Sequence, residues 1–202
     1  PGNSVRAPDT GLQQPVAVAG RLIPHNNRSS KPDEQITLFL FFSFYFLHGF
    51  MRIVITGGAG SIGAELTRQL SVKNRVYIFD INETEMFDLV EELKLEGREV
   101  GGGVVDIRDV TALQRVFALH PNYIINAAAR KHVTPMEETP MEAVSVNIEG
   151  VVNLLSFAVE TDSGFIQIST DKVVNACSVM GATKRVAELI VRNAGYTSVR
   201  FG

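Results

Sequence analysis

Cysteine, tryptophan and histidine are scarce in this chain of 202 residues. It has one cysteine, Cys177, no tryptophan and four histidines. A single cysteine excludes an internal disulfide framework and is typical of a reducing compartment, which predicts a cytoplasmic protein. The histidines are scattered, and no Cys/His cluster has the spacing of a zinc site, so we expect no bound metal.

Neither sign of charge is in large excess. The chain has 19 Lys and Arg against 22 Asp and Glu, a net charge of −3, and no basic run. Nucleic acid is therefore not an expected partner. With 45% apolar and 20% charged residues, the composition is typical of a globular protein, and the length allows one domain with a core of its own.

One long apolar run is present, "ITLFLFFSFYFLHGF" at 36–50. It is shorter than the ~20 residues that a membrane-spanning helix needs, and no small-residue cleavage site follows it. Residues 1–35 lack an apolar period, which predicts disorder or a non-native leader. Three interpretations of 1–50 stay open: sequence upstream of a true start at Met51, a short anchor that would bring a cytoplasmic protein to a membrane, or a buried extra element. We take 51–202 as the globular domain.

From Met51 onward, short apolar segments alternate with segments of helical periodicity. Apolar, β-branched segments recur at 52–56, 75–80, 100–106, 123–129, 164–170 and 197–202. The segments between them carry apolar residues at helical spacing, as Ile62, Leu66 and Leu70 do. This alternation indicates βαβ units and a parallel sheet covered on both faces. The predicted fold is α/β, a doubly wound parallel sheet of Rossmann type with a ligand crevice at the carboxyl ends of its strands.

A glycine-rich loop, "TGGAGSIG" at 56–63, connects the first predicted strand to the first predicted helix. Its first glycine allows a tight turn, the second allows close approach of a diphosphate, and the third allows the helix to pack near the sheet. The free N–H groups of the helix N-terminus favour phosphate. The predicted diphosphate site consists of Gly57, Gly60, Ser61, Ile62 and Gly63.

An acidic residue, Asp80, ends the second predicted strand. A carboxylate there can accept hydrogen bonds from both ribose hydroxyls and would repel a 2′-phosphate, which favours NAD over NADP. Asp106 and Ile107 end the third strand, where they either contact an adenine or, in the case of Asp106, cap the next helix. The small side chains of Ala127 and Ala128 leave room for the flat groups of the cofactor.

Together these features resemble the extended short-chain dehydrogenase/reductase superfamily, whose glycine motif T-G-x-x-G-x-x-G matches 56–63. The stretches "AAARKHVTPMEETPMEAVSVNIEGVVNLL", "ISTDKVVN" and "VMGATKRVAE" resemble one branch of it, the CapD-like nucleotide-sugar 4,6-dehydratases of bacterial polysaccharide biosynthesis. The resemblance covers 51–202. It implies NAD-dependent conversion of UDP-N-acetylglucosamine to its 4-keto-6-deoxy product, and a homo-oligomer at full length. It also implies a C-terminal substrate-binding portion that is missing here, so we expect a fragment with little turnover.

The same resemblance assigns roles to the "TDK" triplet. Asp171 would be the acid and Lys172 the base of the elimination, next to Thr170, and burial would favour the neutral form of both. Lys184 would bind the nicotinamide ribose and supply positive charge. Met180 stands where many relatives have the tyrosine of a Tyr-x-x-x-Lys motif, so the proton of the sugar 4-hydroxyl must pass to Lys172 or to water.

Three further residues are candidates for the substrate site. Lys131 and His132 follow the fourth strand at the rim of the crevice, where they would contact the sugar or the diphosphate. Asn147 lies in the fourth helix, either to organise the site or as a surface residue. Two other functions stay open: a nucleotide-sugar 4-epimerase, which would need the missing tyrosine, and a non-catalytic NAD-binding regulatory protein, which Met180 favours.

Overall fold

The computed structural model describes residues 17–18, 21–22 and 50–202. The first two pairs form the short antiparallel strands β1 (Ala17–Val18) and β2 (Arg21–Leu22). The remainder of 1–49, which includes the apolar run except for Phe50, lies outside the described residues, and so do the predictions made for it.

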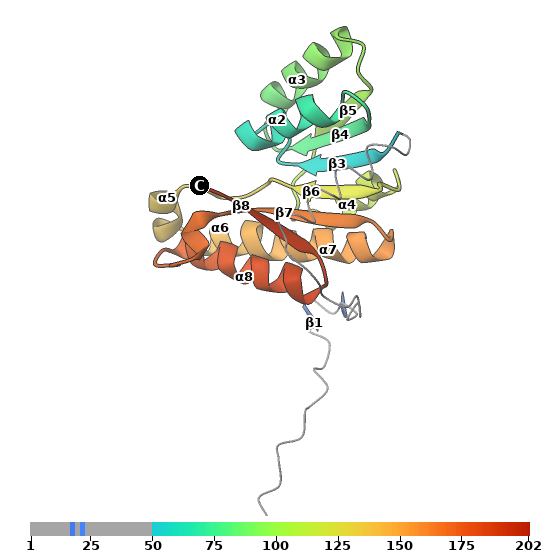
Figure 1. The fold of residues 1–202 in the computed structure, drawn as a ribbon. Helices are drawn as coiled ribbons and strands as arrows, with labels where there is room; N and C mark the ends of the chain where they lie inside the picture. Colours follow the sequence, from blue (N-terminus) through green and yellow to red (C-terminus); the bar gives the residue numbers. More distant parts are fainter. Residues whose placement is uncertain (1–16, 19–20, 23–49) are drawn as a thin grey trace, which may run out of the picture.

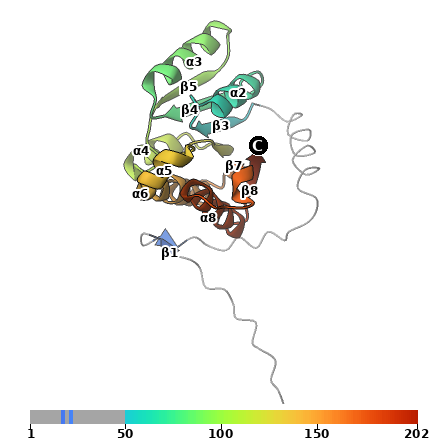
Figure 2. The same cartoon turned by 90° about the vertical axis from the view of Figure 1, so that its left-hand side faces the viewer.

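Residues 50–202 form a six-stranded parallel sheet with helices on both faces (Figure 1 and Figure 2). This confirms the predicted α/β fold. The strands are β3 (Arg52–Thr56), β4 (Arg75–Asp80), β5 (Val100–Val104), β6 (Tyr123–Asn126), β7 (Gly164–Thr170) and β8 (Thr197–Phe201). Their order is β5-β4-β3-β6-β7-β8, so the direction of winding reverses between β3 and β6. Such a reversal leaves a crevice at the carboxyl ends of these two strands.

The helices follow the strands in the expected alternation. They are α2 (Ser61–Leu70), α3 (Glu83–Leu95), α4 (Val110–Phe117), α5 (Val133–Glu138), α6 (Pro140–Val144), the π-helix η1 (Ser145–Glu149), α7 (Gly150–Glu160), the 3₁₀-helix η2 (Asp171–Val173) and α8 (Val179–Asn193). The predicted third and fourth strands, 100–106 and 123–129, are too long at their carboxyl ends. They end at Val104 and Asn126 because the residues that follow leave the sheet to line a cleft.

Both faces of the sheet are buried, as the near-continuous apolar strands predict. Val54 and Ile124 belong to a core shared with α4, α7 and α8. Ile53, Ile55 and Ile78 belong to a second core, on the face covered by α2 and α3. Full burial of each such side chain contributes roughly 1.5–3 kcal/mol. The two cores hold the strands in register and thereby fix the crevice at their ends.

A side-chain cap at the first turn distinguishes α3, α4 and α8 from α2. Asn82, Asp109 and Ser178 precede α3, α4 and α8, and each accepts a hydrogen bond from a backbone N–H of the first turn. The cap of α2 is Gly60, which has no side chain to do this. The first-turn N–H groups of α2 therefore lack a side-chain cap, the arrangement that favours an anion.

The helical run Pro140–Glu160 is the fourth predicted helix, and it is long and apolar enough to cross a membrane by composition. However, 56% of its most apolar 18-residue stretch is buried inside the domain, as in the core helix of a globular protein. It is thus weak evidence for a membrane span. Its π-helical turn, η1, is centred on Asn147.

Three consecutive glycines in β5 allow a matched test of this packing. A Cβ at Gly102 would lie 2.1 Å from the carbonyl oxygen of Ile78 on the paired strand, whereas one at Gly103 would meet nothing nearer than 3.9 Å. We expect Gly102→Ala to lower the free energy of unfolding by about 1–3 kcal/mol. Gly103→Ala should change it little or raise it by up to about 1 kcal/mol, since alanine loses less entropy on folding.

Urea denaturation of the two variants and the unsubstituted chain measures both effects. Equal stability of the two variants would contradict the strand pairing described here.

Candidate cofactor and active site

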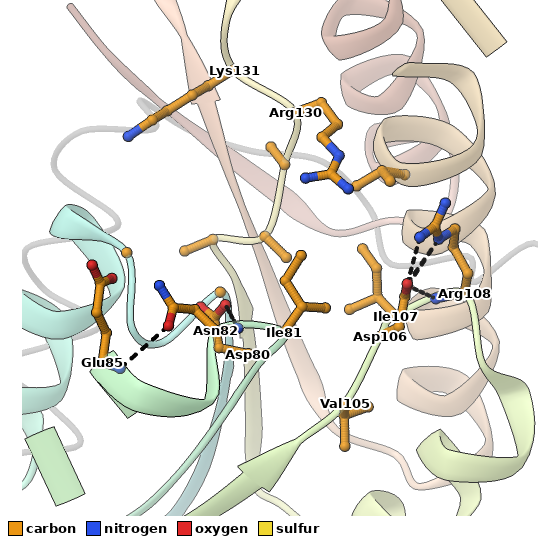
Figure 3. Close-up of a pocket in the computed structure, with 16 residues that line it drawn as sticks. Asp80, Ile81, Asn82, Glu85, Val105, Asp106, Ile107, Arg108, Arg130 and Lys131 are labelled. Carbon is orange, nitrogen blue, oxygen red and sulfur yellow. Dashed lines mark hydrogen bonds and ion pairs between the residues drawn. The ribbon is translucent and has the colours of Figure 1, made fainter. Parts of the chain in front are cut away.

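A cleft of about 250 Å³ opens at the carboxyl ends of β3 and β6, where the winding reverses (Figure 3). It collects residues from four strand ends. Eight of the residues predicted from the sequence line it: Gly57, Gly60, Asp80, Asp106, Ile107, Ala127, Ala128 and Lys131. The remaining predicted residues lie outside its lining, although Ser61, Ile62 and Gly63 are the first turn of α2, next to Gly60.

The glycine loop is packed so closely that side chains are excluded at Gly57 and Gly63. Gly57 has a φ of +69°, and a Cβ there would lie 2.4 Å from the backbone nitrogen of Ala128. A Cβ at Gly63 would lie 2.1 Å from the carbonyl oxygen of Gly57. Glycine is therefore required at both positions, and the loop presents backbone to the cleft, as a diphosphate site needs.

Asp80 is held in place by two backbone N–H groups. One carboxylate oxygen accepts from Ala59 of the glycine loop and the other from Asn82, each at 3.0 Å. An ionised carboxylate has about four acceptor positions, so one remains on each oxygen. Asp80 thus joins the glycine loop to the start of α3 while keeping capacity for two further donors.

Asp106 lines the cleft, but its acceptor positions are already in use. Arg108 donates to its two oxygens through the backbone N–H, Nε and Nη2, at 2.6–3.0 Å. These hydrogen bonds hold the pKa of Asp106 below its usual value, against the effect of partial burial. An adenine contact by Asp106 stays a prediction and would require Arg108 to move. The alternative, that Asp106 caps α4, is wrong, because the cap is Asp109.

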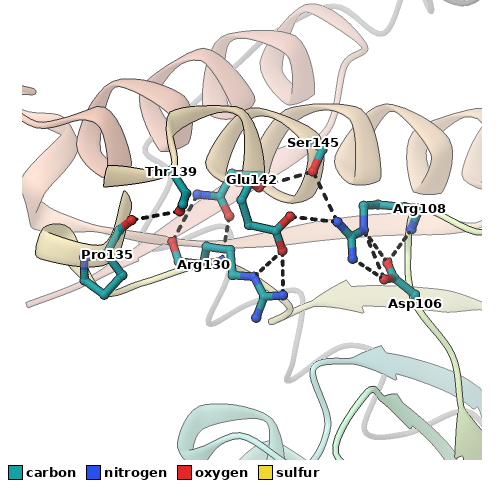
Figure 4. A network of polar contacts seen from close by, with 8 residues as sticks. Asp106, Arg108, Arg130, Pro135, Thr139, Glu142 and Ser145 are labelled. Carbon is teal, nitrogen blue, oxygen red and sulfur yellow. Dashed lines mark hydrogen bonds and ion pairs between the residues drawn. The ribbon is translucent and has the colours of Figure 1, made fainter. Parts of the chain in front are cut away.

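A charged network that the sequence predictions missed involves Arg108 and Arg130, two residues of the cleft lining (Figure 4). Glu142 of α6 accepts from Arg108 through one oxygen, at 2.9 Å, and from Arg130 through the other, at 2.6 and 2.9 Å. The hydrogen bond from Arg130 is the main reason why the pKa of Glu142 lies below its usual value. Both arginines also line the cleft. No sequence motif indicates this network, because its three residues are far apart in the sequence.

Asn147 is 1% exposed, so the interpretation as a surface residue is wrong. Its side-chain oxygen accepts from the backbone N–H of Arg130 at 2.8 Å, and its Nδ2 donates to the carbonyl oxygen of the same residue at 3.1 Å. Nδ2 also donates to Thr183 Oγ1 at 3.1 Å. Asn147 therefore fixes the loop after β6 relative to α8. A direct contact between Asn147 and a substrate stays a prediction.

Lys184 is also buried, with 6% of its surface exposed. Its Nζ donates to the carbonyl oxygen of Ile168 on β7 at 2.6 Å. Burial lowers the pKa of Lys184 from 10.5 to about 8, and the charge of Glu188 opposes this shift. A buried polar row lies beside it: Thr56 donates to Asn126, Asn126 to Gln167, and Gln167 to the same Ile168 carbonyl.

The Thr-Asp-Lys triplet lies at the carboxyl end of β7 and differs from the prediction in its exposure. The side chains of Asp171 and Lys172 are 61% and 58% exposed, so the predicted burial is wrong for the described chain. Thr170 Oγ1 and Lys172 Nζ donate to the same oxygen of Asp171, at 3.0 and 3.3 Å. These two contacts, that of Thr170 first, lower the pKa of Asp171, whereas the sequence interpretation needed it raised.

The other predicted site residues divide between core and surface. Met180 is buried, with Met136 and Ala143 as its apolar neighbours. A thioether in this cluster takes no part in proton transfer. Lys131 and His132 are exposed on the loop between β6 and α5, and Lys131 lines the cleft.

A parallel sheet with a tightly packed glycine-rich loop at its reversal point defines a Rossmann-type protein. Residues 53–202 match the family described as "Polysaccharide biosynthesis protein" (Polysacc_synt_2), and the chain belongs to this family.

Similar proteins include an uncharacterized membrane protein of Methanocaldococcus jannaschii, 40% identical over 162 residues, which are 74% of this chain and 48% of that protein. The capsular polysaccharide biosynthesis protein CapD of Staphylococcus aureus is 36% identical over 74% of this chain and 27% of its own length. A UDP-N-acetylglucosamine 4,6-dehydratase (inverting) of Campylobacter jejuni is 32% identical over 75% of this chain and 47% of its own. The chain thus spans about half or less of the length of these relatives.

Among solved structures, Pen from Bacillus thuringiensis superposes with a TM-score of 0.71 at 30% identity. The match covers 77% of this chain and 51% of Pen.

The buried ammonium of Lys184 leads to a prediction about stability. Its pKa in the folded chain, about 8, lies below the ordinary 10.5, so the folded state binds this proton less tightly than the unfolded state. Below pH 8 both states carry the proton and the full cost is present, of the order of 3 kcal/mol. The cost falls as the pH rises from 8 towards 10.5. We expect Lys184→Met to raise the free energy of unfolding by about 1–2 kcal/mol at pH 7, less at pH 10.

Denaturant titrations at the two pH values measure this difference. Lys172→Met, which removes an exposed lysine, serves as the control and should change stability by less than about 0.5 kcal/mol. A Lys184→Met variant that is less stable at pH 7, or a gain that does not depend on pH, would contradict the assigned burial.

Proposed function

We propose that this chain carries the cofactor site and the catalytic groups of an NAD-dependent nucleotide-sugar 4,6-dehydratase. The substrate would be UDP-N-acetylglucosamine and the product its 4-keto-6-deoxy derivative, a precursor for surface polysaccharide. The observation that carries the proposal is the hydrogen-bonded triplet Thr170–Asp171–Lys172 at the end of β7, on the same edge of the sheet as the glycine loop. The family and the similarity to a Campylobacter dehydratase support it.

The cleft residues fit a dinucleotide. Gly57 and Gly63 leave no room for side chains, and α2 begins without a side-chain cap. The N–H groups of Gly57, Gly58, Ala59 and Gly60 already donate hydrogen bonds, so the first-turn N–H groups of α2 are those that would face a diphosphate. The two remaining acceptor positions of Asp80 suit two ribose hydroxyls, and its charge disfavours a 2′-phosphate. Glu85 lines the same cleft and adds a second negative charge. When bound, NAD would take up a hydride from the sugar and return it.

In the elimination step, Asp171 would donate a proton to the departing C6 hydroxyl and Lys172 would remove the proton on C5. This requires a neutral carboxylic acid and a neutral amine, whereas exposed Asp171 favours its ionised form. A substrate that covers the pair would exclude water from it, and a desolvated ion pair is costly. Transfer of one proton from Lys172 to Asp171, which lie 3.3 Å apart, turns the pair into the two neutral groups that the step needs. No net charge is gained or lost.

The first step removes the proton of the 4-hydroxyl, and Met180 cannot accept it. An ordered water would take this role, or Lys172, which would then have to release that proton to water before it removes the proton on C5. Thr170 would orient the accepting group. The buried charge of Lys184 would stabilise negative charge that develops nearby. A 4-epimerase would need a base at position 180, so the buried methionine disfavours that alternative. The partner is thus a nucleotide sugar, and association with a membrane or with further copies of the chain stays a prediction.

Dehydration can be tested with the 202-residue chain and, because this chain spans about half or less of the length of its relatives, with a form extended past Gly202. After incubation with NAD and UDP-N-acetylglucosamine, mass spectrometry should show loss of one water from the sugar, with no net reduction of NAD. We expect turnover mainly in the extended protein. Asp171→Asn and Lys172→Met should each lower its rate by about 10²–10⁴-fold, the usual contribution of a general acid or base.

Lys94→Met, on the exposed face of α3, is the control and should leave the rate unchanged. An isomer of unchanged mass would indicate an epimerase. NAD binding without any sugar product in the extended protein would favour the regulatory alternative and overturn the proposal.

Cofactor preference can be tested by calorimetry with NAD and NADP. The unsubstituted chain should bind NAD more tightly. In Asp80→Asn the amide NH₂, itself a donor, would face one of the two N–H groups that now hold the carboxylate. We therefore expect at least a tenfold loss of NAD affinity and a smaller preference for NAD over NADP. Asp88→Asn, on the exposed side of α3, is the matched control. If Asp80→Asn bound NAD as tightly as the unsubstituted chain does, the assigned ribose site would be excluded.

A further inference from the structure

Lys184 and Glu188 lie one helical turn apart on α8, yet they do not pair. At this spacing a lysine and a glutamate on a helix can form an ion pair. In the described part of the chain, Lys184 Nζ instead donates to the Ile168 carbonyl oxygen and forms no ion pair. The ammonium is therefore buried beside a carboxylate that is directed elsewhere.

Glu188 is held by Arg200 of β8. Arg200 Nε donates to Oε1 at 2.8 Å and Nη2 to Oε2 at 2.7 Å, a bidentate contact. Arg185 adds one bond to Oε2, at 3.2 Å. The Glu188 side chain is 7% exposed, and burial favours its neutral form, but the contact with Arg200 first, and then those with Ser169 and Arg185, outweigh this and lower its pKa. Glu188 is thus a buried carboxylate whose two oxygens are both bound to arginine.

We propose that Arg200 is a positioning residue for Lys184: by binding both oxygens of Glu188, it keeps this carboxylate from pairing with the lysine one turn away. A bidentate arginine pair is among the strongest charge-assisted contacts that a carboxylate makes. A buried carboxylate that loses it is strongly driven to find another cation. Two cations are near enough to pair with a released Glu188. Arg185 already donates one N–H to it, which is a weaker contact than the bidentate one, and Lys184 is the cation that is itself buried.

Other charged groups near Lys184 do not replace Glu188 in this role. The elements packed against α8 are α5, α6, η1, α7, β7, η2 and β8. Their charged residues are Glu137 and Glu138 on α5, Glu142 on α6, Glu149 on η1, Glu160 on α7, Asp171 and Lys172 on η2, and Arg200 on β8. Glu142 is bound to Arg108 and Arg130, and Asp171 to Lys172. Glu188 is the carboxylate that raises the pKa of Lys184.

The consequence concerns the charge of Lys184 at neutral pH. While Arg200 holds Glu188, burial leaves the lysine with a pKa of about 8, so an appreciable fraction is neutral just above neutrality. If Glu188 were released to pair with the lysine, the ammonium would be charged at every physiological pH. The relevance of this to catalysis rests on the proposed function, whereas the pairing of the three side chains does not.

The pKa of Lys184 can be measured directly by NMR of chain labelled with ¹³C at the lysine ε-carbons. Its signal is identified by its absence in Lys184→Met. The unsubstituted chain should show a lysine that titrates near pH 8. In Arg200→Gln we expect its proton affinity to rise at least tenfold, and in Arg200→Lys, which keeps a charge but not the bidentate contact, to rise less. Arg185→Gln is the matched control, with a smaller effect.

Arg200→Gln could raise the proton affinity of Lys184 in two ways: by releasing Glu188, or by removing the direct repulsion between the Arg200 charge and the ammonium. The same substitution in a chain that already carries Glu188→Gln separates these two causes. In Glu188→Gln, the further change Arg200→Gln should leave the titration of Lys184 nearly unchanged. An equal rise in both backgrounds, or no rise in Arg200→Gln or Arg200→Lys, would overturn the proposal. Because the measurement uses neither NAD nor sugar, its outcome is independent of the dehydration assay.

Discussion

The close approach of two backbones at the reversal point of the sheet is the constraint on which the candidate site depends. The loop after β3 lies so near the end of β6 that a Cβ on Gly57 would overlap the backbone of Ala128. The first turn of α2 is equally close to the same loop, through Gly63. A side chain at Gly57 would force this loop away from the end of β6, and one at Gly63 would force α2 away from the loop. Because glycine occupies both positions, the first turn of α2, which has no side-chain cap, stays next to the cleft.

Buried polar groups connect this loop to β7, the strand that the proposed catalytic residues follow. The row Thr56–Asn126–Gln167 runs across three strands and ends at the carbonyl oxygen to which Lys184 donates. Buried polar side chains are costly unless each has a partner, and here each has one. Asn147 performs a similar role for the loop after β6. These bonds allow polar residues to remain inside a largely apolar core, and they fix the position of Lys184.

The two halves of the candidate site differ in how complete they are within the described residues. The proposed cofactor half is ordered by hydrogen bonds, with Asp80 held by two N–H groups and the arginines held by Glu142. The proposed acid and base, Asp171 and Lys172, are exposed and ion-paired. An exposed pair in water retains its charges, whereas the proposed chemistry needs them neutral. In the proposed function, coverage of the pair by substrate is therefore part of the mechanism.

The amino-acid pattern of 51–202 was sufficient to predict the fold and most of the cofactor cleft, because these depend on local rules. A buried parallel strand requires an apolar run, and a diphosphate loop requires glycine at set spacing, as at 56–63. Tertiary structure decided what depends on the neighbours of a side chain. It joined Arg108, Glu142 and Arg130 across distant loops and buried Asn147 and Lys184, while leaving Asp171 and Lys172 in water. The burial and charge of a residue follow from the elements packed around it, and a linear pattern does not specify them.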